Sequence, residues 1–402
     1  MADKHGPVFM IRLGVHPTLV VSRHEAVKEC FTTNDKAFAS RPRYSSGKLL
    51  GYNNAGFGFA PYGPLWREMR KLSVIGLLSY RRLDEKRNWV EPIEVEMNKW
   101  LEELPFNVVL RMVAGKRYFV NGVHANEEAR HVIAGFRQFV HLLEARVPSD
   151  VLPFLEWIDL DGYLKSMKHV AELLDTSVQG WVEEHVMKLK SDPSSRQDFI
   201  DVMLSILKDD SVFGHTRETV IKATVVSLIV GGSATTFAAS ACLLFLLLNH
   251  RHALERVSRR ARCKSWLSPP APLLIAHEAI EDCNVCGYNI PKGTRLFVNV
   301  WKLHRDPRTW SDPEKFQPER FLTSNADISV FGRHFELIPF GSGRRCCPGI
   351  ALALQMLHLT VARLLQGFDI TPVGMTPRMG FFSPKETPQK VMLKPRLPSQ
   401  LY

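Results

Sequence analysis

The sequence predicts a mainly α-helical protein with small β-sheets, built around one long buried helix. Apolar residues recur at helical spacing through most of the 402-residue chain, and strand-like alternation is confined to regions near its two ends. Residues 223–249 carry no charge and are long enough to form the central helix. The composition, 45% hydrophobic and 23% charged, is that of an ordinary globular protein.

The individual elements follow the same patterns along the chain. Residues 9–13 and 19–22 alternate as a β-hairpin does, and short strands are expected at 280–285 and 295–298. A long, proline-punctuated coil is expected over residues 306–339, and a coil of that length within a compact domain tends to be functional. The predicted helices cover residues 23–32, 66–77, 90–104, 108–114, 127–143, 164–189, about 216–250, and 349–365.

The uncharged stretch at 223–249 is also long enough to span a bilayer, which takes ~20 apolar residues. Its centre, residues 231–236, contains two glycines and three hydroxyl side chains, which lipid would not accommodate well. We therefore expect a helix buried in a protein core. The N-terminus is polar and continues into a run of only strand length, so neither a signal peptide nor an anchor is expected.

The charge balance narrows the class of partners, and the cysteine content indicates the redox compartment. The 52 Lys+Arg residues outnumber the 41 Asp+Glu residues, which favours acidic partners. The basic residues are scattered without an aromatic-interleaved patch, so we expect no nucleic-acid partner. Seven cysteines, an odd number, fit a reducing compartment better than a disulfide framework. Cys283 and Cys286 have zinc-like spacing, but no second pair lies at a suitable distance in the sequence.

The most informative segment is the Gly-rich loop at residues 340–349, which leads into the last predicted helix. Its glycines permit a tight bend and leave backbone N–H groups free to face a sulfur atom. Arg345 offers a planar cationic fork suited to a carboxylate. Cys347 lies just before the helix N-terminus, where the helix dipole stabilises a thiolate, and Pro348 sets the entry to that helix. Such a thiolate suits a metal ligand; the alternative is an incidental cysteine pair in a Gly-rich loop.

This loop resembles the haem-binding loop of the cytochrome P-450 monooxygenases, matching it at Phe340, Gly343, Arg345, Cys347 and Gly349. The resemblance implies haem b (iron protoporphyrin IX) as the cofactor, these five residues as its binding loop, and Cys347 as the iron ligand. It also distinguishes the adjacent cysteines, because counting from the phenylalanine leads to Cys347. Cys346 stands where the family has an apolar residue, so we expect it to pack.

Other segments resemble the same family in the expected order. Trp66 and Arg70 match its Trp-x-x-x-Arg helix and would pair with a haem propionate, and His277 would reach a propionate from a strand. The resemblance therefore implies the family's fold, with a long buried central helix over the haem.

The motif at residues 231–236 lies where the family's central helix bends over the oxygen site. By resemblance, Gly232, Ala234 and Thr235 form the catalytic segment, and Thr235 supplies the hydroxyl that helps to deliver protons. The family usually has an acid at the position of Ala234. Without that carboxylate, we expect slower proton delivery and loss of reducing equivalents as hydrogen peroxide.

Two further departures concern the extent of the chain. We expect residues 1–402 to form a single catalytic domain, truncated at the N-terminus because the family's membrane anchor is absent, and shortened around 250–268. The family's Glu-x-x-Arg helix is missing there: its Glu and Arg fall on Cys263 and Trp266. Arg320 would normally pair with that helix, and removing the partners of a buried charge costs roughly 3–5 kcal/mol.

The resemblance is closest to plant enzymes that oxidise alkaloids and terpenoids, including the nicotine N-demethylase relatives. It implies insertion of one oxygen atom from O2 into a lipophilic small molecule, such as an alkaloid, terpenoid or phenolic. An NADPH-dependent flavoprotein reductase would supply electrons, and the basic surface near Arg344 would suit the acidic face of that partner. By the resemblance, the substrate would contact residues 45–58, 226–233 and 272–277 and the loop near 379–383. These segments are largely apolar, with Leu49, Leu50, Val230, Leu273, Leu274, Phe381 and Phe382.

The resemblance implies a location at the cytosolic face of the endoplasmic reticulum membrane, although a chain without the anchor could be soluble. Two alternatives to a monooxygenase remain. One is a same-fold enzyme that rearranges peroxides without O2 or a reductase, which is compatible with Ala234. The other is a non-catalytic product of a damaged or mis-spliced gene, which the missing Glu-x-x-Arg helix supports.

Overall fold

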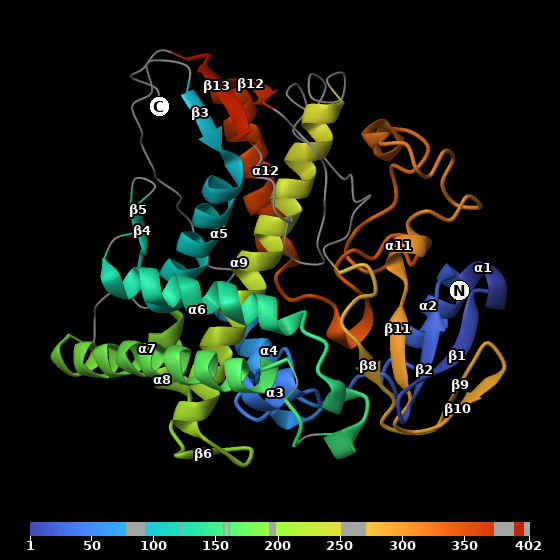
Figure 1. Cartoon of the computed structure of the whole chain (residues 1–402), viewed down its shortest axis with the longest axis horizontal. Coiled ribbons are helices and arrows are strands. Elements are labelled where there is room, and N and C mark those ends of the chain that lie inside the picture. The colour runs from blue at the N-terminus through green and yellow to red at the C-terminus, as the bar shows by residue number, and fades with distance from the viewer. Residues whose placement is uncertain are drawn as a thin grey trace.

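The computed structural model describes residues 1–77, 93–120, 123–124, 126–155, 157–159, 161–192, 198–250, 271–373 and 390–397. The fold is mainly helical with small sheets, as predicted (Figure 1). The helices are α1 (Ala2–His5), α2 (His24–Phe31), α3 (Ser45–Leu49), α4 (Pro64–Leu77), α5 (Met97–Ala114), α6 (Glu127–Leu143), α7 (Tyr163–Ser191), α8 (Phe199–Ile206), α9 (Arg217–Asn249), α11 (Val300–Leu303) and α12 (Ile350–Gly367).

The strands are short and form several separate sheets. They are β1 (Val8–Leu13), β2 (His16–Val21), β3 (Ile93–Glu96), β4 (Phe119–Val120), β5 (Val123–His124), β6 (Ser211–Val212), β7 (His215–Thr216), β8 (His277–Glu278), β9 (Cys283–Val285), β10 (Tyr288–Ile290), β11 (Arg295–Val298), β12 (Phe368–Val373) and β13 (Lys390–Pro395). Four 3-10 turns are also present among the described residues: η1 (Pro148–Asp150), η2 (Pro153–Leu155), η3 (Pro318–Leu322) and η4 (Gly343–Arg345).

Helix α9 is the central helix of the molecule and packs against α5, α7 and α12 (Figure 1). Buried residues lie on all of its sides, including Val225, Ile229 and Leu244. Among the described residues, α9 and α12 are long and apolar enough to cross a membrane by length and composition alone. The buried core position of α9 confirms the interpretation of the uncharged stretch as a core helix.

The four-stranded sheet joins the N-terminal hairpin to a strand far along the chain. β1 pairs antiparallel with β2, β2 pairs parallel with β11, and β11 pairs antiparallel with β8. A single bridge between Ser40 and Glu278 extends this contact to the segment after α2. The sheet therefore brings residues 31–41 close to the C-terminal half of the fold.

Several predicted boundaries change because tertiary packing outweighs local signals. The predicted break between residues 104 and 108 is wrong: α5 continues through Pro105 because it lies along α9, with Phe106 and Leu110 buried. Residues 93–96, predicted as helix, form β3, which pairs with β13. The coil at 306–339 contains only η3 as a helical turn, and the predicted helix at 127–143 matches α6 at both ends.

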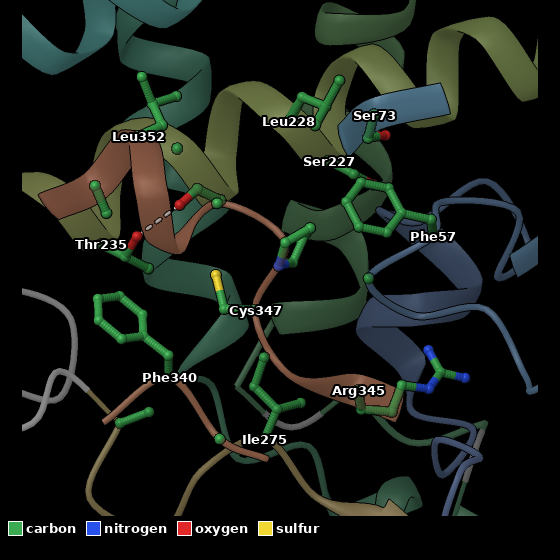
Figure 2. Close-up of a pocket in the computed structure, with 18 of the residues that line it drawn as sticks. Phe57, Ser73, Ser227, Leu228, Thr235, Ile275, Phe340, Arg345, Cys347 and Leu352 are labelled. Atoms are coloured by element: carbon green, nitrogen blue, oxygen red, sulfur yellow. Dashed lines mark hydrogen bonds between the residues drawn. The ribbon is translucent and has the colours of Figure 1, made fainter. Parts of the chain in front are cut away.

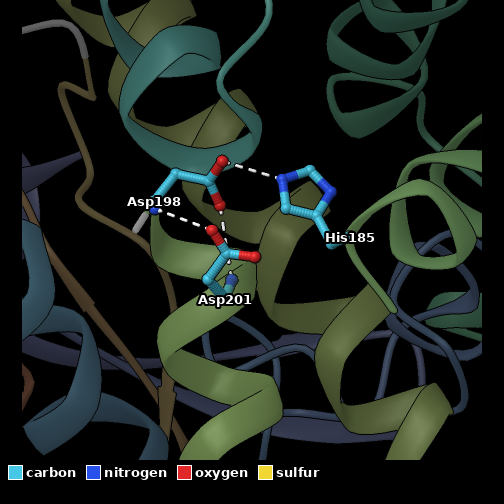
Figure 3. A group of neighbouring side chains, drawn as sticks. All are labelled: His185, Asp198 and Asp201. Carbon is cyan, nitrogen blue, oxygen red and sulfur yellow. Dashed lines mark hydrogen bonds and ion pairs between the residues drawn. The ribbon is translucent and has the colours of Figure 1, made fainter. Parts of the chain in front are cut away.

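A buried polar cluster joins α7 to the start of α8 (Figure 3). Asp198 caps α8 by accepting the N–H groups of Ile200 (3.1 Å) and Asp201 (3.3 Å), and its other oxygen lies 2.7 Å from His185 Nε2. The group is compact enough to hold a metal ion by distance alone. However, His185 Nδ1 lies 2.6 Å from the carbonyl oxygen of Trp181, and Lys188 pairs with Asp201 at 3.3 Å. We therefore interpret the cluster as a helix cap with a buried ion pair.

This cluster makes stability depend on pH. Burial lowers the pKa of His185, but the hydrogen bond to Asp198 and the nearby charges of Asp198 and Asp201 raise it more, so the net shift is upward. A raised pKa stabilises the fold fully below the unfolded value of about 6.5, and this contribution is lost as pH rises through the folded pKa.

We expect Asp198→Asn, which keeps the cap but removes the charge, to lower the free energy of unfolding by about 1.5–3 kcal/mol near pH 6. The deficit should be smaller near pH 9, because wild-type His185 loses its proton as pH rises through its folded pKa. Urea unfolding midpoints of the two proteins at both pH values provide the measurement. An equal deficit at both values would show that the pair contributes only a neutral hydrogen bond.

Candidate functional site

A single cavity contains most of the residues that the sequence singled out. It has a volume of about 310 Å³ and lies between α9, the start of α12, α4 and the Gly-rich loop. In Figure 2, the sulfur of Cys347 and the hydroxyl of Thr235 approach this space from different elements. Thus the cavity brings together the predicted iron ligand and the predicted oxygen-site hydroxyl.

The Gly-rich loop is held in a tight bend beneath this cavity. Gly343 has φ +66° and begins the 3-10 turn η4, a backbone conformation that favours glycine. Cys347 N–H donates to the carbonyl oxygen of Phe340 (2.9 Å), and Cys346 N–H donates to that of Gly343 (3.1 Å). Gly349 caps α12, which begins at the next residue. Cys347 lines the cavity, whereas the Cys346 sulfur lies 3.6 Å from the carbonyl oxygen of Gly341.

The Cys347 thiol lies in an environment that opposes ionisation without a metal. Burial raises its pKa, and the Gly349 backbone N–H and the Arg70 charge lower it only in part. The sequence predicted a thiolate stabilised by the helix N-terminus. The Gly349 N–H does lower the pKa of Cys347, as predicted, but desolvation raises that pKa by more.

Arg345 and Arg70 lie side by side against Trp66. The Arg345 guanidinium is 4.4 Å from the Trp66 ring centroid and that of Arg70 is 5.6 Å away. Arg345 donates to the carbonyl oxygens of Ala39 (2.5 Å) and Ala60 (2.6 Å). Arg70 donates to that of Cys346 (2.5 Å). All three predicted residues line the cavity, and each arginine also fixes backbone around the loop.

His277 also reaches the cavity, but as a neutral ring. Burial lowers its pKa well below the ordinary value, and the charge of Arg41 lowers it further. Its Nδ1 lies 2.8 Å from the carbonyl oxygen of Phe38, which assigns the proton to Nδ1. The Nε2 atom, left without a proton, would need to gain one before donating to a propionate. The sequence singled out His277 as a haem-site residue, and the structure places it at the cavity; the sequence did not indicate this charge state.

Sequence reasoning missed Arg41, a third arginine in the cavity wall. It donates to the carbonyl oxygens of Ile275 and Ala276, both at 2.8 Å, across more than 230 residues of sequence. No local pattern marked it, because Arg41 lies two residues after a short apolar run, 37–39, and in no spaced motif.

The chemistry of these donors fits haem. Burial, together with the charges of Arg41 and Arg70, lowers the pKa of Arg345 to about 8, and burial lowers the pKa of Arg41 to about 10. Nη1 of Arg345 and Nε of Arg41 are buried without a hydrogen-bond partner among the described residues. No acidic side chain is among the described residues that line the cavity. An anionic group is therefore required, and the propionates of haem supply two carboxylates.

The three catalytic candidates on α9 differ in their position. Thr235 lines the cavity, and its hydroxyl donates to the carbonyl oxygen of Gly231 at 2.6 Å. Gly232 also lines it and permits close packing, because an added Cβ would lie 2.9 Å from Val109. Ala234 is half-buried and is not among the described lining residues.

Two charged residues outside the cavity were also singled out by the sequence. Arg320, predicted to lose its partners, donates to Gln317 Oε1 (2.9 Å) and to the carbonyl oxygens of Asp312 and Lys315. Burial nevertheless lowers its pKa, so these neutral acceptors replace a charged partner only in part. Arg344, whose side chain is exposed, pairs with Asp35 at 3.2 Å; its suitability for an acidic partner stays a prediction. The expected site of the Glu-x-x-Arg helix lies outside the described residues.

The predicted substrate contacts are only partly at the cavity. Leu274 lines it, whereas Leu49, Leu50, Val230 and Leu273 are not among its described lining residues. Phe381 and Phe382 lie outside the described part of the chain. The predicted segments 45–58, 226–233 and 272–277 do reach the cavity through other apolar residues, Phe57, Leu228 and Ile275, and Val109 adds to the same wall.

Comparison with known proteins gives consistent matches over the whole chain. The family described as Cytochrome P450 matches residues 1–259 and 267–399. Vinorine hydroxylase of Rauvolfia serpentina is 45% identical, and the match covers 100% of this chain and 86% of that protein. Protopine 6-monooxygenase of Eschscholzia californica is 40% identical, with 100% and 87% covered. Flavonoid-6-hydroxylase of Ocimum basilicum is 44% identical, with 100% and 86% covered.

Solved structures share the fold. A zebrafish cytochrome P450 determined with abiraterone superposes with a TM-score of 0.78 at 24% sequence identity, covering 98% of both chains. This likeness concerns the fold, and the sequence matches above establish the family. The chain therefore belongs to the cytochrome P450 family, in a plant branch of these haem-dependent monooxygenases, oxidoreductases that incorporate oxygen from O2.

Proposed function

We propose that the chain oxidises a lipophilic plant secondary metabolite, with Cys347 as the ligand of haem b. The observation that carries this proposal is that the Cys347 thiol and the Thr235 hydroxyl border one cavity beside three half-buried arginines. Bound haem supplies O2 activation, because donation from a thiolate ligand favours cleavage of the O–O bond. Electrons come from an NADPH-dependent flavoprotein reductase, by membership of the family.

The residues of the chain would bind, orient and protect the reacting groups. Arg41, Arg70 and Arg345 hold the propionates through donors that otherwise remain unpaired or bonded to backbone. Thr235, whose hydroxyl donates to the carbonyl oxygen of Gly231, would present the lone pairs of its hydroxyl oxygen to accept and pass on a proton. The apolar wall limits water to the few molecules that such a transfer needs.

The character of the cavity supports a neutral, apolar substrate. By their names, the relatives act on vinorine, protopine and flavonoids. The described wall is largely apolar and includes no acid, so a cationic amine entering it would lose hydration without gaining a partner. An alkaloid, as in the nicotine N-demethylase relatives, would therefore enter as its uncharged base, and a terpenoid or phenolic would enter as it is.

Residues 1–402 act as one catalytic domain in this proposal, shortened around 250–268. The unmatched residues 260–266 of the family comparison support this position. The alignment with vinorine hydroxylase spans 434 residues against the 402 of this chain, so that relative has internal residues that this chain lacks. Location at the cytosolic face of the endoplasmic reticulum membrane is proposed from the plant relatives.

The first experiment is expression followed by the spectrum of the reduced, carbon-monoxide-bound protein. A red-shifted Soret band typical of thiolate-ligated haem supports the assigned site, and NADPH-dependent turnover with a plant reductase then supports the monooxygenase. Turnover of a hydroperoxide without NADPH or reductase would instead favour the peroxide-rearranging alternative. A band at the position of histidine-ligated haem, or no haem, would favour the non-catalytic alternative.

Arg41→Gln tests the arginine that the sequence did not indicate. We expect haem to leave the variant about 10–100 times more readily, because one charge-assisted hydrogen bond to a carboxylate contributes about 1.5–3 kcal/mol. Transfer of haem to excess apomyoglobin measures this loss. Arg43→Gln is the matched control, since Arg43 is exposed and does not line the cavity. Equal haem transfer from both variants would remove Arg41 from the haem site.

A further inference from the structure

We propose that Asp35 is a positioning residue that holds the cysteine loop in its ligating conformation from a distant part of the sequence. The inference rests on the proposed haem site and assigns a role to a residue that no motif indicated. Asp35 lies just after α2, and its side chain is 19% exposed. Its carboxylate reaches the bend of the loop 309 residues further along the chain.

The first reason is that the turn η4 receives no capping hydrogen bond from the residue that precedes it. The N–H groups at the start of a helical turn have no partner within it, and the preceding side chain usually accepts from one of them. η4 starts at Gly343, but the preceding Ser342 provides no such bond. The Ser342 hydroxyl donates instead to the carbonyl oxygen of Gly332 at 2.7 Å.

Asp35 supplies the missing acceptor. Its Oδ1 accepts the N–H of Arg344, the second residue of η4, at 2.8 Å. Its Oδ2 lies 3.2 Å from Nε of the same arginine. One carboxylate therefore caps the turn and neutralises the side chain that leaves it, which is a charge-assisted arrangement.

The second reason is the close approach between Asp35 and Gly343. A Cβ added to Gly343 would lie 2.2 Å from Asp35 Oδ1 and 3.2 Å from the carbonyl oxygen of Phe31. The bend of the loop is thus seated directly on the segment after α2. Because Cys346 N–H bonds to Gly343 O, displacement of this bend shifts the residues that lead to Cys347.

The same segment supports other residues of the predicted haem site. Ala39 O accepts from Arg345 and Phe38 O from His277 Nδ1, while Phe31 packs against the His277 ring with centroids 5.1 Å apart. On the side of residues 31–39, Asp35 makes its contact through a charged side chain, whereas Ala39 and Phe38 use their backbone and Phe31 uses its ring. Residues 31–39 therefore pack against the loop and its neighbours, and Asp35 fixes the position of the bend at Gly343.

The test compares variants that remove different parts of this contact. Asp35→Ala removes both bonds, Asp35→Asn keeps an oxygen acceptor for the Arg344 N–H, and Arg344→Gln keeps that N–H but removes the ion pair. Asp306→Ala is the matched control, because Asp306 likewise accepts the N–H and the Nε of one arginine, Arg308, at 3.0 Å each, away from the cavity.

The readouts are the reduced carbon-monoxide spectrum and the electron paramagnetic resonance of the ferric haem that each variant retains. We expect Asp35→Ala to convert from the thiolate band to the shorter-wavelength band about ten times faster than wild type, with shifted ferric signals. Asp35→Asn and Arg344→Gln should stay near wild type. Asp306→Ala should change only the melting temperature.

The outcomes separate this inference from the proposed function. Wild type is measured first: if it lacks the thiolate band, the proposed haem site fails, and the positioning role of Asp35, which rests on that site, is overturned with it. Given a wild-type band, Asp35→Ala with unchanged conversion and unchanged ferric signals overturns the positioning role. A lowered melting temperature with unaltered spectra would likewise overturn it, because that is the behaviour of the Asp306 control.

Discussion

Cys347→Ser removes the thiolate signature of the reduced, carbon-monoxide-bound haem and all O2-dependent turnover, whereas Cys346→Ser keeps both. Only Cys347 lines the cavity, and its backbone N–H is tied to Phe340. A serine hydroxyl is a poor substitute because it neither ionises readily nor donates electron density as a thiolate does. The adjacent cysteine cannot take over, because its sulfur lies beside the carbonyl oxygen of Gly341.

The pair of variants is internally controlled, since both change one sulfur to oxygen in the same loop. Spectra are recorded at equal haem content, and turnover is followed with reductase and NADPH. We expect Cys347→Ser to lose activity to the background level while Cys346→Ser remains within about twofold of wild type. The reverse pattern would assign iron ligation to Cys346 and would shift the whole motif by one residue.

The loop could be predicted from the sequence because its information is local. The spacing from Phe340 to Gly349, the helix that follows and the tight bend are all properties of contiguous residues. The long helix α9 was predictable for the same reason, as an uncharged stretch with helical length. In both cases a single contiguous stretch of sequence determines the local structure, and the tertiary fold retains that structure.

The supporting residues were not predictable because they act through space. Arg41 contacts residues more than 230 positions away, and Asp35 contacts Arg344 over 309 positions. Neither lies in a periodic or spaced motif. The sheet that joins the N-terminal part of the chain to the C-terminal half includes the parallel pairing of β2 with β11. Parallel pairing between distant strands leaves no signature in either strand alone.

Local rules also failed where packing compensated for an unfavourable residue. Pro105 breaks helical hydrogen bonding, yet α5 is continuous because its buried face, including Phe106 and Leu110, lies along α9. Similarly, carbonyl groups of its own loop accept hydrogen bonds from Arg320, the residue predicted to lack its usual charged partners. Such compensations depend on geometry that forms only after the chain has folded.

Ala234→Asp should shift consumed NADPH from hydrogen peroxide to oxidised product. No acidic side chain is among the described residues that line the cavity, so Thr235 lacks a nearby carboxylate to return its proton. Position 234 is adjacent to Thr235 and only half-buried, so an aspartate there can remain hydrated while serving the hydroxyl. We expect a gain at the low end of the roughly 10²–10⁴-fold that a positioned proton-transfer group contributes.

The measurement is the ratio of product to hydrogen peroxide per NADPH consumed, because a change in this ratio separates proton delivery from substrate binding. Ala234→Asn is the matched control: it has the same size and polarity but cannot transfer a proton in the same way. Thr235→Ala added to Ala234→Asp should abolish the gain, since the two side chains then no longer act as a relay. If Asn and Asp raise product formation equally, the substitution acts by packing on α9, and the chain delivers protons without a carboxylate at this position.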